Sequence, residues 1–169
     1  MNIVLTGFMA SGKSEISKAI SKITGRLCLD TDDIVEKNEG MTINEIFAKH
    51  GEEYFREAET EAVKVAACQV NAVIATGGGV VLKHENIEIL RKTGVIINLT
   101  PDFEVIEERL QNAAKTRPLL QNQDIEAVRK RFNDRLPFYE NCDKQIRIVS
   151  EKTPMQYAKE ILDLVKSYE

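Results

Sequence analysis

The chain has 169 residues, of which 43% are hydrophobic and 30% are charged, and this composition suits a single globular domain. A net charge of -4 lacks the basic excess of a nucleic-acid-binding protein, and the apolar runs are shorter than the ~20 residues that span a bilayer. The three cysteines have no metal-ligand spacing and the first residues lack the features of a signal peptide, which predicts reduced thiols in a cytoplasmic protein.

Short apolar runs alternate with longer segments of helical period. The predicted elements, in chain order, are a strand at 3–5, a helix at 14–24, a strand at 27–29, helices at 42–50 and 52–69, a strand at 72–75, a helix at 83–93, a strand at 95–99, helices at 102–110 and 124–139, a strand at 145–149 and a helix at 154–167. Residues 111–123 are polar and predict an irregular segment. Apolar strands that alternate with helices indicate a parallel sheet covered on both faces, which binds ligands at the carboxyl ends of its strands.

Residues 7–14, GFMASGKS, match the phosphate-binding motif G-x-x-x-x-G-K-[ST] between the first predicted strand and the first predicted helix. Glycine-rich backbone wraps phosphate oxygens there, and the following helix N-terminus adds unpaired N–H donors. Lys13 reaches the terminal phosphates and the Ser14 hydroxyl binds Mg²⁺. A chance glycine-rich turn is the structural alternative, and the strand–loop–helix context disfavours it. The motif predicts nucleotide binding without naming the reaction.

Two carboxylates, Asp30 and Asp32, follow the second predicted strand. One can hold Mg²⁺ through water, and the other can accept or orient the proton of an attacking hydroxyl. Helix capping explains both residues equally well, because Asp is a favoured N-cap and acids suit a first turn. The segment leaves both explanations open, whereas Asp33 is assigned to capping. The acids at 57–61 are interpreted as a solvated helix face.

Residues 77–79, after the third predicted strand, are three consecutive glycines. Such a run costs backbone entropy on folding, and that cost is justified where a ligand must touch the main chain. A flexible turn is the alternative, since glycine often marks loops.

Several arginines are candidates for binding anionic groups. Arg56 follows Glu52 by four residues, so an ordinary pair on a helix surface is an equal alternative. Arg117 lies in the irregular segment, where a mobile loop could close over a nucleotide and stabilise charge on its terminal phosphate. Arg135 precedes a predicted helix end, and interaction with the helix dipole is its alternative. Arg109 could stack near an adenine, but a surface role is favoured.

Together these segments resemble the shikimate kinase family over nearly the whole chain. The similarity is carried by the phosphate loop, LDTD at 29–32, IF at 46–47, FR at 55–56 with Glu59, TGGG at 76–79, TRPLL at 116–120 and RLPFY at 135–139. It implies a P-loop NTPase with a nucleoside-monophosphate-kinase-like α/β fold, in three layers around a five-stranded parallel sheet of order 2-3-1-4-5. It also implies a single kinase domain, 1–169, with a substrate-binding region at about 32–61 and a lid at about 111–123.

The resemblance implies that a cytoplasmic monomer uses ATP and Mg²⁺ to phosphorylate the 3-hydroxyl of shikimate, in the pathway to chorismate and aromatic amino acids. The implied catalytic residues are Lys13, Asp32 and Arg117. The implied ATP contacts are Ala10, Ser11, Gly12, Lys13, Ser14, Glu15, Arg117 and Lys152, and the implied metal contacts are Ser14 and Asp30. The implied shikimate contacts are Asp32, Arg56, Gly78, Gly79 and Arg135. Ala10 stands where many members carry glycine, and its methyl group predicts ordinary dihedral angles; Glu15 is expected to face outward.

Two other functions are weighed against this one. A gluconate kinase of the same fold would share the phosphate loop, but the Asp-Thr-Asp, Gly-Gly-Gly and Arg-Pro-Leu-Leu segments argue against it. A nucleotide-dependent switch of the GTPase type would carry a guanine-reading Asn-Lys-x-Asp motif after a later strand, and the sequence contains none.

Overall fold

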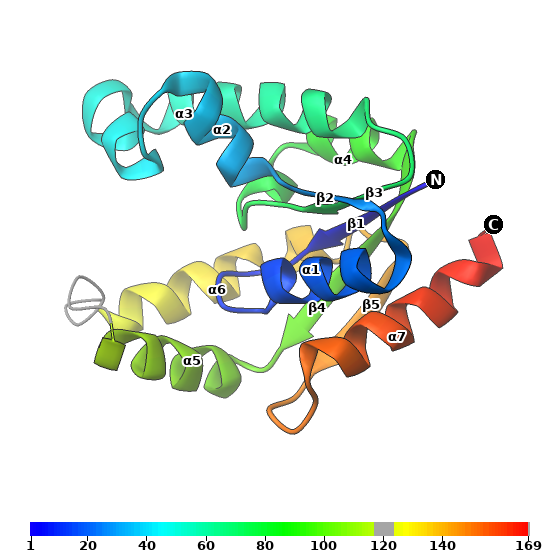
Figure 1. Cartoon of the computed structure of the whole chain (residues 1–169). Helices are drawn as coiled ribbons and strands as arrows, with labels where there is room; N and C mark the ends of the chain where they lie inside the picture. Colours follow the sequence, from blue (N-terminus) through cyan, green and yellow to red (C-terminus); the bar gives the residue numbers. More distant parts are fainter. Residues whose placement is uncertain (117–123, 169) are drawn as a thin grey trace.

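The computed structural model describes residues 1–116 and 124–168 and contains the five-stranded parallel sheet that the sequence predicts (Figure 1). Its strands are β1 (Asn2–Thr6), β2 (Leu27–Asp30), β3 (Ala72–Ala75), β4 (Gly94–Pro101) and β5 (Lys144–Ile148). Their order is β2-β3-β1-β4-β5, and Val4 at the centre of β1 pairs with Ile74 on one side and Ile96 on the other. All four pairings are parallel, so the carboxyl ends of the strands lie along one edge.

Helices connect the strands. They are α1 (Lys13–Thr24), α2 (Thr31–Glu39), α3 (Ile43–Ala67), the short η1 (Val80–Leu82), α4 (His84–Arg91), α5 (Phe103–Thr116), α6 (Ile125–Tyr139), α7 (Pro154–Val165) and the short η3 (Lys166–Tyr168). Apolar periodicity did not predict α2, which buries only Thr31 and Val35, although the family resemblance implied a helical region from about 32 to 61. The prediction that 111–116 are irregular is wrong, because α5 continues to Thr116 through a segment that includes the good helix formers Gln111, Ala113, Ala114 and Lys115.

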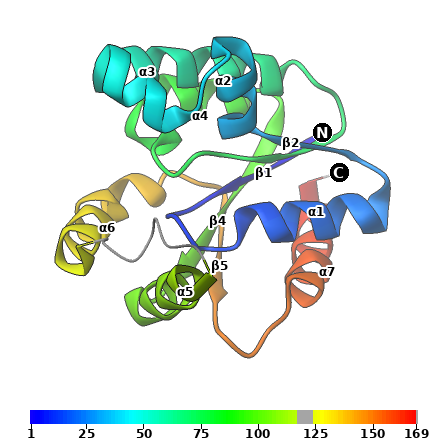
Figure 2. The same ribbon diagram turned by 60° about the vertical axis from the view of Figure 1, so that its left-hand side comes forward.

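The sheet is covered on both faces, which explains why its strands read as continuous apolar runs. On one face, Val4, Ile74 and Ile96 pack against α3, α4, α5 and α6 in one hydrophobic cluster. On the other, Ile3, Val73 and Ile97 pack against α1 and α7 in a second cluster. Rotated by 60°, the molecule shows α2 and α3 on one side of the loop after β1 and α5 on the other (Figure 2).

The long helix α3 is two helices joined at a kink. Its first residue follows a capping box, in which Thr42 and Glu45 exchange side-chain and backbone hydrogen bonds. Gly51 has φ 83° and ψ 177°, so the helical path breaks there, as the sequence predicts. A small core of Val35, Ile46 and Phe55, with Ala62, joins the two halves to α2. Across 1–116 and 124–168, no helix is both long enough and apolar enough to cross a membrane.

Candidate active site

The loop between β1 and α1 lies at the carboxyl edge of the sheet. Gly7 (φ 147°) approaches its neighbours so closely that a Cβ there would lie 2.8 Å from the Ser11 Oγ and 2.9 Å from the Leu99 carbonyl oxygen. Gly12 (φ 96°) is the N-cap of α1 and has no side chain to occupy the first-turn N–H groups. The loop therefore offers a helix N-terminus to an anion, as its motif predicts.

The Lys13 side chain folds back onto this loop. Its Nζ donates hydrogen bonds to the carbonyl oxygens of Gly7 (2.7 Å) and Phe8 (2.8 Å) and to the Ser11 hydroxyl (3.3 Å). Burial lowers the pKa of Lys13 to about 8, although the nearby carboxylates of Asp32 and Asp30 act in the opposite direction. The Lys13 ammonium group therefore lies beside the position that the motif predicts for a phosphate.

The prediction of ordinary dihedral angles at Ala10 is wrong. Its φ is 58°, in the left-handed region, which costs an L-residue about 1–2 kcal/mol. The Ala10 carbonyl oxygen accepts a hydrogen bond of 2.8 Å from Arg109 Nη1, which holds the loop in this conformation from α5. Arg109 is therefore part of the site, although its sequence context favoured a surface role.

Asp30 caps α2, which is one of the two explanations that the sequence left open, and it also contacts the phosphate-loop residue Ser14. Its Oδ1 accepts a hydrogen bond from the Asp32 N–H (3.0 Å) and caps α2, while its Oδ2 accepts one from the Ser14 hydroxyl (2.9 Å). A hydroxyl beside a carboxylate is the hard-oxygen chemistry that Mg²⁺ prefers, and this ion is usually held by one or two carboxylates plus phosphate oxygens. Among the residues placed in the structure, no cluster of three or more His, Cys, Asp or Glu side chains could hold a metal ion.

Asp32 lies against the first of the three consecutive glycines. A Cβ on Gly77 would lie 2.5 Å from Asp32 Oδ1, so any side chain here would displace the Asp32 carboxylate. The Gly77 N–H donates a buried 2.8 Å hydrogen bond to the Thr31 hydroxyl. Burial raises the pKa of Asp32 to about 6, with help from the negative charges of Asp30 and Glu59 and against the Lys13 ammonium. Such a carboxylate is a better proton acceptor than an ordinary aspartate.

Arg56 and Glu59 form a partly buried ion pair beside the third glycine. Arg56 Nη1 lies 3.0 Å from Glu59 Oε1, and its Nη2 lies 3.4 Å from Glu52 Oε1, so the surface pair expected from the sequence is present but is the longer of the two. The guanidinium group occupies the space that a Cβ on Gly79 would need. Glu59 is 1% exposed, so the interpretation of 57–61 as a solvated face is wrong at this position.

The buried Glu59 has a raised pKa because of burial, which the positive charges of Arg56 and Arg135 oppose. Its signal in the sequence was the three-residue spacing from Arg56, which places both side chains on one helix face. This carboxylate holds the guanidinium group of Arg56 toward the glycines.

Arg135, in α6, lies beside the middle glycine. A Cβ on Gly78 would be 3.4 Å from Arg135 Nη1, and the guanidinium carbon lies 5.8 Å from the centre of the Phe8 ring in the phosphate loop. The Tyr139 hydroxyl, one turn further along α6, donates a 2.7 Å hydrogen bond to the Gly78 carbonyl oxygen. Asp32, Arg56 and Arg135, which the sequence separates by up to 103 positions, thus meet at three consecutive glycines.

A second hollow, of about 480 Å³, opens on the other side of the phosphate loop. Its walls are Ala10, Gly12, Glu15, Arg109, Ala113, Thr116 and Pro154. Glu15 is exposed, as expected, and lines this hollow. Lys152 does not line it and instead forms an exposed 3.0 Å ion pair with Glu160.

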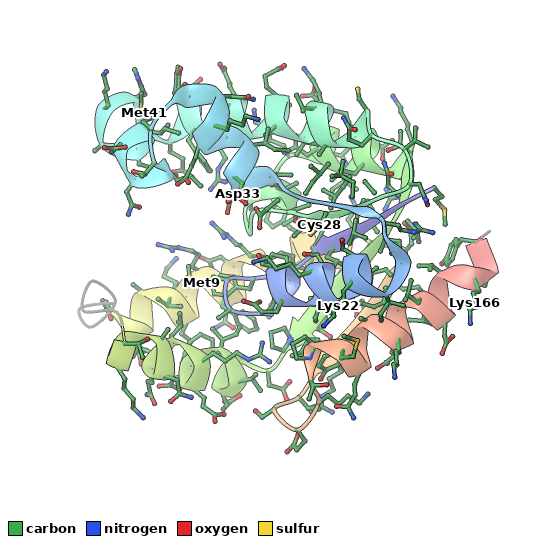
Figure 3. All side chains as sticks on the ribbon, viewed as in Figure 1. Met9, Lys22, Cys28, Asp33, Met41 and Lys166 are labelled. Atoms are coloured by element: carbon green, nitrogen blue, oxygen red, sulfur yellow. The ribbon has the colours of Figure 1, made fainter. Side chains whose placement is uncertain are left out.

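The remaining predicted contact, Arg117, lies outside the described residues. Figure 3 shows the arrangement of the two sides: Met9 in the phosphate loop lies opposite Asp33, which is in the first turn of α2. The site is therefore built from the ends of β1, β2 and β3 together with α3 and α6, and the second hollow adds α5.

This fold and site define a P-loop kinase of the nucleoside-monophosphate-kinase type, with a phosphate loop beside a carboxylate, two arginines and a run of main-chain groups. The fold alone is shared with distant structures, such as a gluconokinase from Sinorhizobium meliloti, at 15% identity and a TM-score of 0.61, covering 99% of this chain and 92% of that one.

Closer comparisons identify the family. Residues 9–166 match the family described as shikimate kinase. Over 164 residues the chain is 49% identical to the shikimate kinase of Caldanaerobacter subterraneus subsp. tengcongensis, covering 95% of this chain and 94% of that protein. The structure of the shikimate kinase of Acinetobacter baumannii in complex with shikimate is similar with a TM-score of 0.87 at 33% identity, covering 99% and 94% of the two chains. The chain belongs to the shikimate kinase family.

Proposed function

We propose that this protein is a shikimate kinase, which transfers the terminal phosphoryl group of ATP to the 3-hydroxyl of shikimate. The observation that carries the proposal is the meeting of Asp32, Arg56 and Arg135 at Gly77–Gly79, beside a phosphate loop. Two guanidinium groups suit a carboxylate, because their planar forks pair with both of its oxygens. A carboxylate with a raised pKa suits an attacking hydroxyl.

The nucleotide would occupy the loop side of the site. The backbone N–H groups and Lys13 bind the β and γ phosphates, which requires Lys13 to leave its carbonyl partners in the loop. Ser14 and Asp30 would hold Mg²⁺, which neutralises charge on the phosphate oxygens. The hollow beside Arg109 is open and next to the loop, and it has room for the adenine ring. Arg117 would reach the phosphates from the lid at about 111–123.

The acceptor would lie beside Gly77–Gly79. Arg56 and Arg135 bind its carboxylate with the main-chain N–H groups of Gly78 and Gly79, and Asp32 orients the hydroxyl in line with the γ phosphate and accepts its proton. Little covalent chemistry is needed from the protein, because positioning and charge neutralisation lower the barrier to phosphoryl transfer. The helices α2 and α3 at about 32–61 supply most of this wall.

We also propose that the protein acts as a monomer in the cytoplasm. The three cysteines, Cys28, Cys68 and Cys142, are free thiols, which suits the reducing cytoplasm.

A substrate panel with purified protein, ATP and Mg²⁺ tests the proposal. We expect ADP release to depend strongly on shikimate and to stay near background with gluconate, with nucleoside monophosphates or without an acceptor. Preferred turnover of gluconate, or equal ADP release without an acceptor, would overturn the proposal.

Replacing Arg56 with alanine tests the assignment of the acceptor side. Because a hydrogen bond to a charged group contributes about 1.5–3 kcal/mol, Arg56→Ala should raise KM for shikimate by about 10- to 150-fold while KM for ATP changes less than about twofold. Arg147→Ala is the matched control, since Arg147 is an exposed arginine whose Nη2 lies 2.8 Å from Asp102 Oδ2, away from the glycines. An unchanged KM for shikimate in Arg56→Ala would leave the guanidinium group with a structural role only.

A further inference from the structure

The Tyr139 hydroxyl lies on the core side of Gly77–Gly79, called the glycine triplet below. Tyr139 ends α6, is 4% exposed and packs into the core that covers this face of the sheet. Its OH donates a 2.7 Å hydrogen bond to the Gly78 carbonyl oxygen. Burial raises the pKa of this phenol to about 12, so it is a neutral hydrogen-bond donor at physiological pH, even though Arg135 beside it lowers the pKa by charge and hydrogen bonding.

A hydrogen bond to one carbonyl oxygen also fixes the next N–H. The peptide bond is planar, and none in the described chain is cis, so the Gly79 N–H points opposite to the Gly78 carbonyl. Glycines have no side chain to restrict them, and this peptide could otherwise rotate between several orientations. The tyrosine thereby directs the Gly79 N–H away from the core.

The two ends of the triplet have their own anchors. The Gly77 N–H donates to the Thr31 hydroxyl at 2.8 Å, and the carbonyl oxygen of Val80, just after the triplet, accepts a 3.0 Å hydrogen bond from Asn86 Nδ2. Both partners are completely buried. Removing the tyrosine hydroxyl would consequently free the middle peptide while the ends of the loop stay in place.

Tyr139 also lies next to Arg135, which binds the acceptor carboxylate in the proposed function. Arg135 is four residues earlier, on the same side of α6, and its guanidinium group lies against Gly78. We propose that the Tyr139 hydroxyl is a positioning group for recognition of the acceptor carboxylate, because it fixes the Gly78–Gly79 peptide and supports Arg135. This inference rests on the proposed function.

The test combines a variant with a change in the substrate. Tyr139→Phe removes one oxygen atom and keeps the buried ring, so the core stays filled. We expect kcat/KM for shikimate to fall about 10-fold, mainly through KM, with KM for ATP within about twofold of wild type. The same variant should lose less than about twofold with shikimate methyl ester, which keeps the hydroxyls but has no carboxylate charge, because coupling appears only where both partners are present.

Tyr157→Phe is the matched control. Tyr157 is also a buried tyrosine whose hydroxyl bonds to main chain, donating to the Val149 carbonyl oxygen at 3.1 Å and accepting from the Val149 N–H at 2.7 Å, but it packs on the other face of the sheet. We expect it to leave KM for shikimate unchanged, although it should lower the melting temperature.

Each outcome separates the two claims. Equal losses with the acid and the ester in Tyr139→Phe, or no loss with either, would overturn the positioning role while leaving the kinase assignment intact. A wild-type protein that does not phosphorylate shikimate would instead overturn the proposed function itself.

Discussion

At the scale of single residues, the site holds charges whose pKa values are displaced in opposite directions. Burial lowers the pKa of Lys13 to about 8 and raises that of Asp32 to about 6, so both groups are held closer to neutrality than in water. Such displacement is typical of groups that exchange or stabilise charge during a reaction. It also means that burial of these two charged groups reduces the stability of the fold.

Asp32→Asn should therefore stabilise the fold and damage the activity. The folded-state pKa of Asp32 lies above its ordinary 3.8, so the folded protein binds the proton more tightly, and the carboxylate destabilises it at pH 7. This penalty shrinks as pH falls through about 6 and disappears below about 4. We expect the variant to gain about 1–2 kcal/mol in urea-induced unfolding at pH 7, with no gain at about pH 4, while kcat falls about 10²–10⁴-fold.

A matched substitution, Asp134→Asn, removes an exposed carboxylate that lies 2.8 Å from Lys130. It should change the free energy of unfolding by less than about 0.5–1 kcal/mol, because exposed ion pairs contribute little. If Asp32→Asn loses stability at pH 7, then Asp32 is held in place by favourable interactions and its pKa is not raised.

The site residues that could be predicted from the sequence are those in motifs whose residue types suit a known chemical role. The phosphate loop was placed from the spacing of its motif. Asp30 and Asp32 were candidates because parallel strands bring their carboxyl ends together, but helix capping was an equal explanation and only the family resemblance gave them roles. The burial of Glu59, the positive φ of Ala10 and the contact of Arg109 with the loop were missed. Each depends on a neighbour distant in sequence, which local periodicity does not record.

At the scale of elements, the strands were predictable because buried parallel strands are continuous apolar runs. The helix α2 was not, because its stability comes from its ends: Asp30 caps the first turn, and Gly40, with φ 66°, ends the helix by donating its N–H to the Glu36 carbonyl oxygen. The first turn of α2 also carries Asp32, so the cap that begins the helix places a functional side chain.

The break in α3 depends on the conformation of one glycine. Gly51 has φ 83° and ψ 177°, a region open essentially to glycine only, and a Cβ there would meet nothing within 4 Å. Gly51→Ala should lower the free energy of unfolding by about 1–3 kcal/mol through backbone strain alone. It should also raise KM for shikimate, because the strain falls within the helix that carries Arg56. Urea-induced unfolding and steady-state kinetics measure both effects.

Gly40→Ala is the control for this change. Gly40 also has open space around it, but its φ of 66° and ψ of 22° lie in the left-handed helical region, where alanine costs about 1–2 kcal/mol. A smaller loss in Gly51→Ala than in Gly40→Ala would mean that α3 straightens through residue 51, and that the kink is not needed for the fold.

At the scale of the whole molecule, the site has two halves, the phosphate loop and the three glycines at 77–79, and different helices hold each half in place. The phosphate loop is held between β1 and α1, and α1 packs with α7 on one face of the sheet. The glycine triplet is held by α2, α4 and α6, and its arginines come from α3 and α6 on the other face. The strand β1 runs between the two faces, so the half-sites meet at its carboxyl end.

Because the half-sites have separate supports, their ligands should stabilise the protein separately. A ligand at about 100 times its Kd adds about 2.7 kcal/mol to the free energy of unfolding, which raises the melting temperature of a protein of this size by about 5–10 °C. Shikimate and Mg·ADP should each produce such a shift in the wild type. Arg56→Ala should lose the shikimate shift and keep the Mg·ADP shift, and Lys13→Ala should do the reverse. If either variant loses both shifts, binding of the two ligands is coupled, and the inference that the two halves of the site are held independently is wrong.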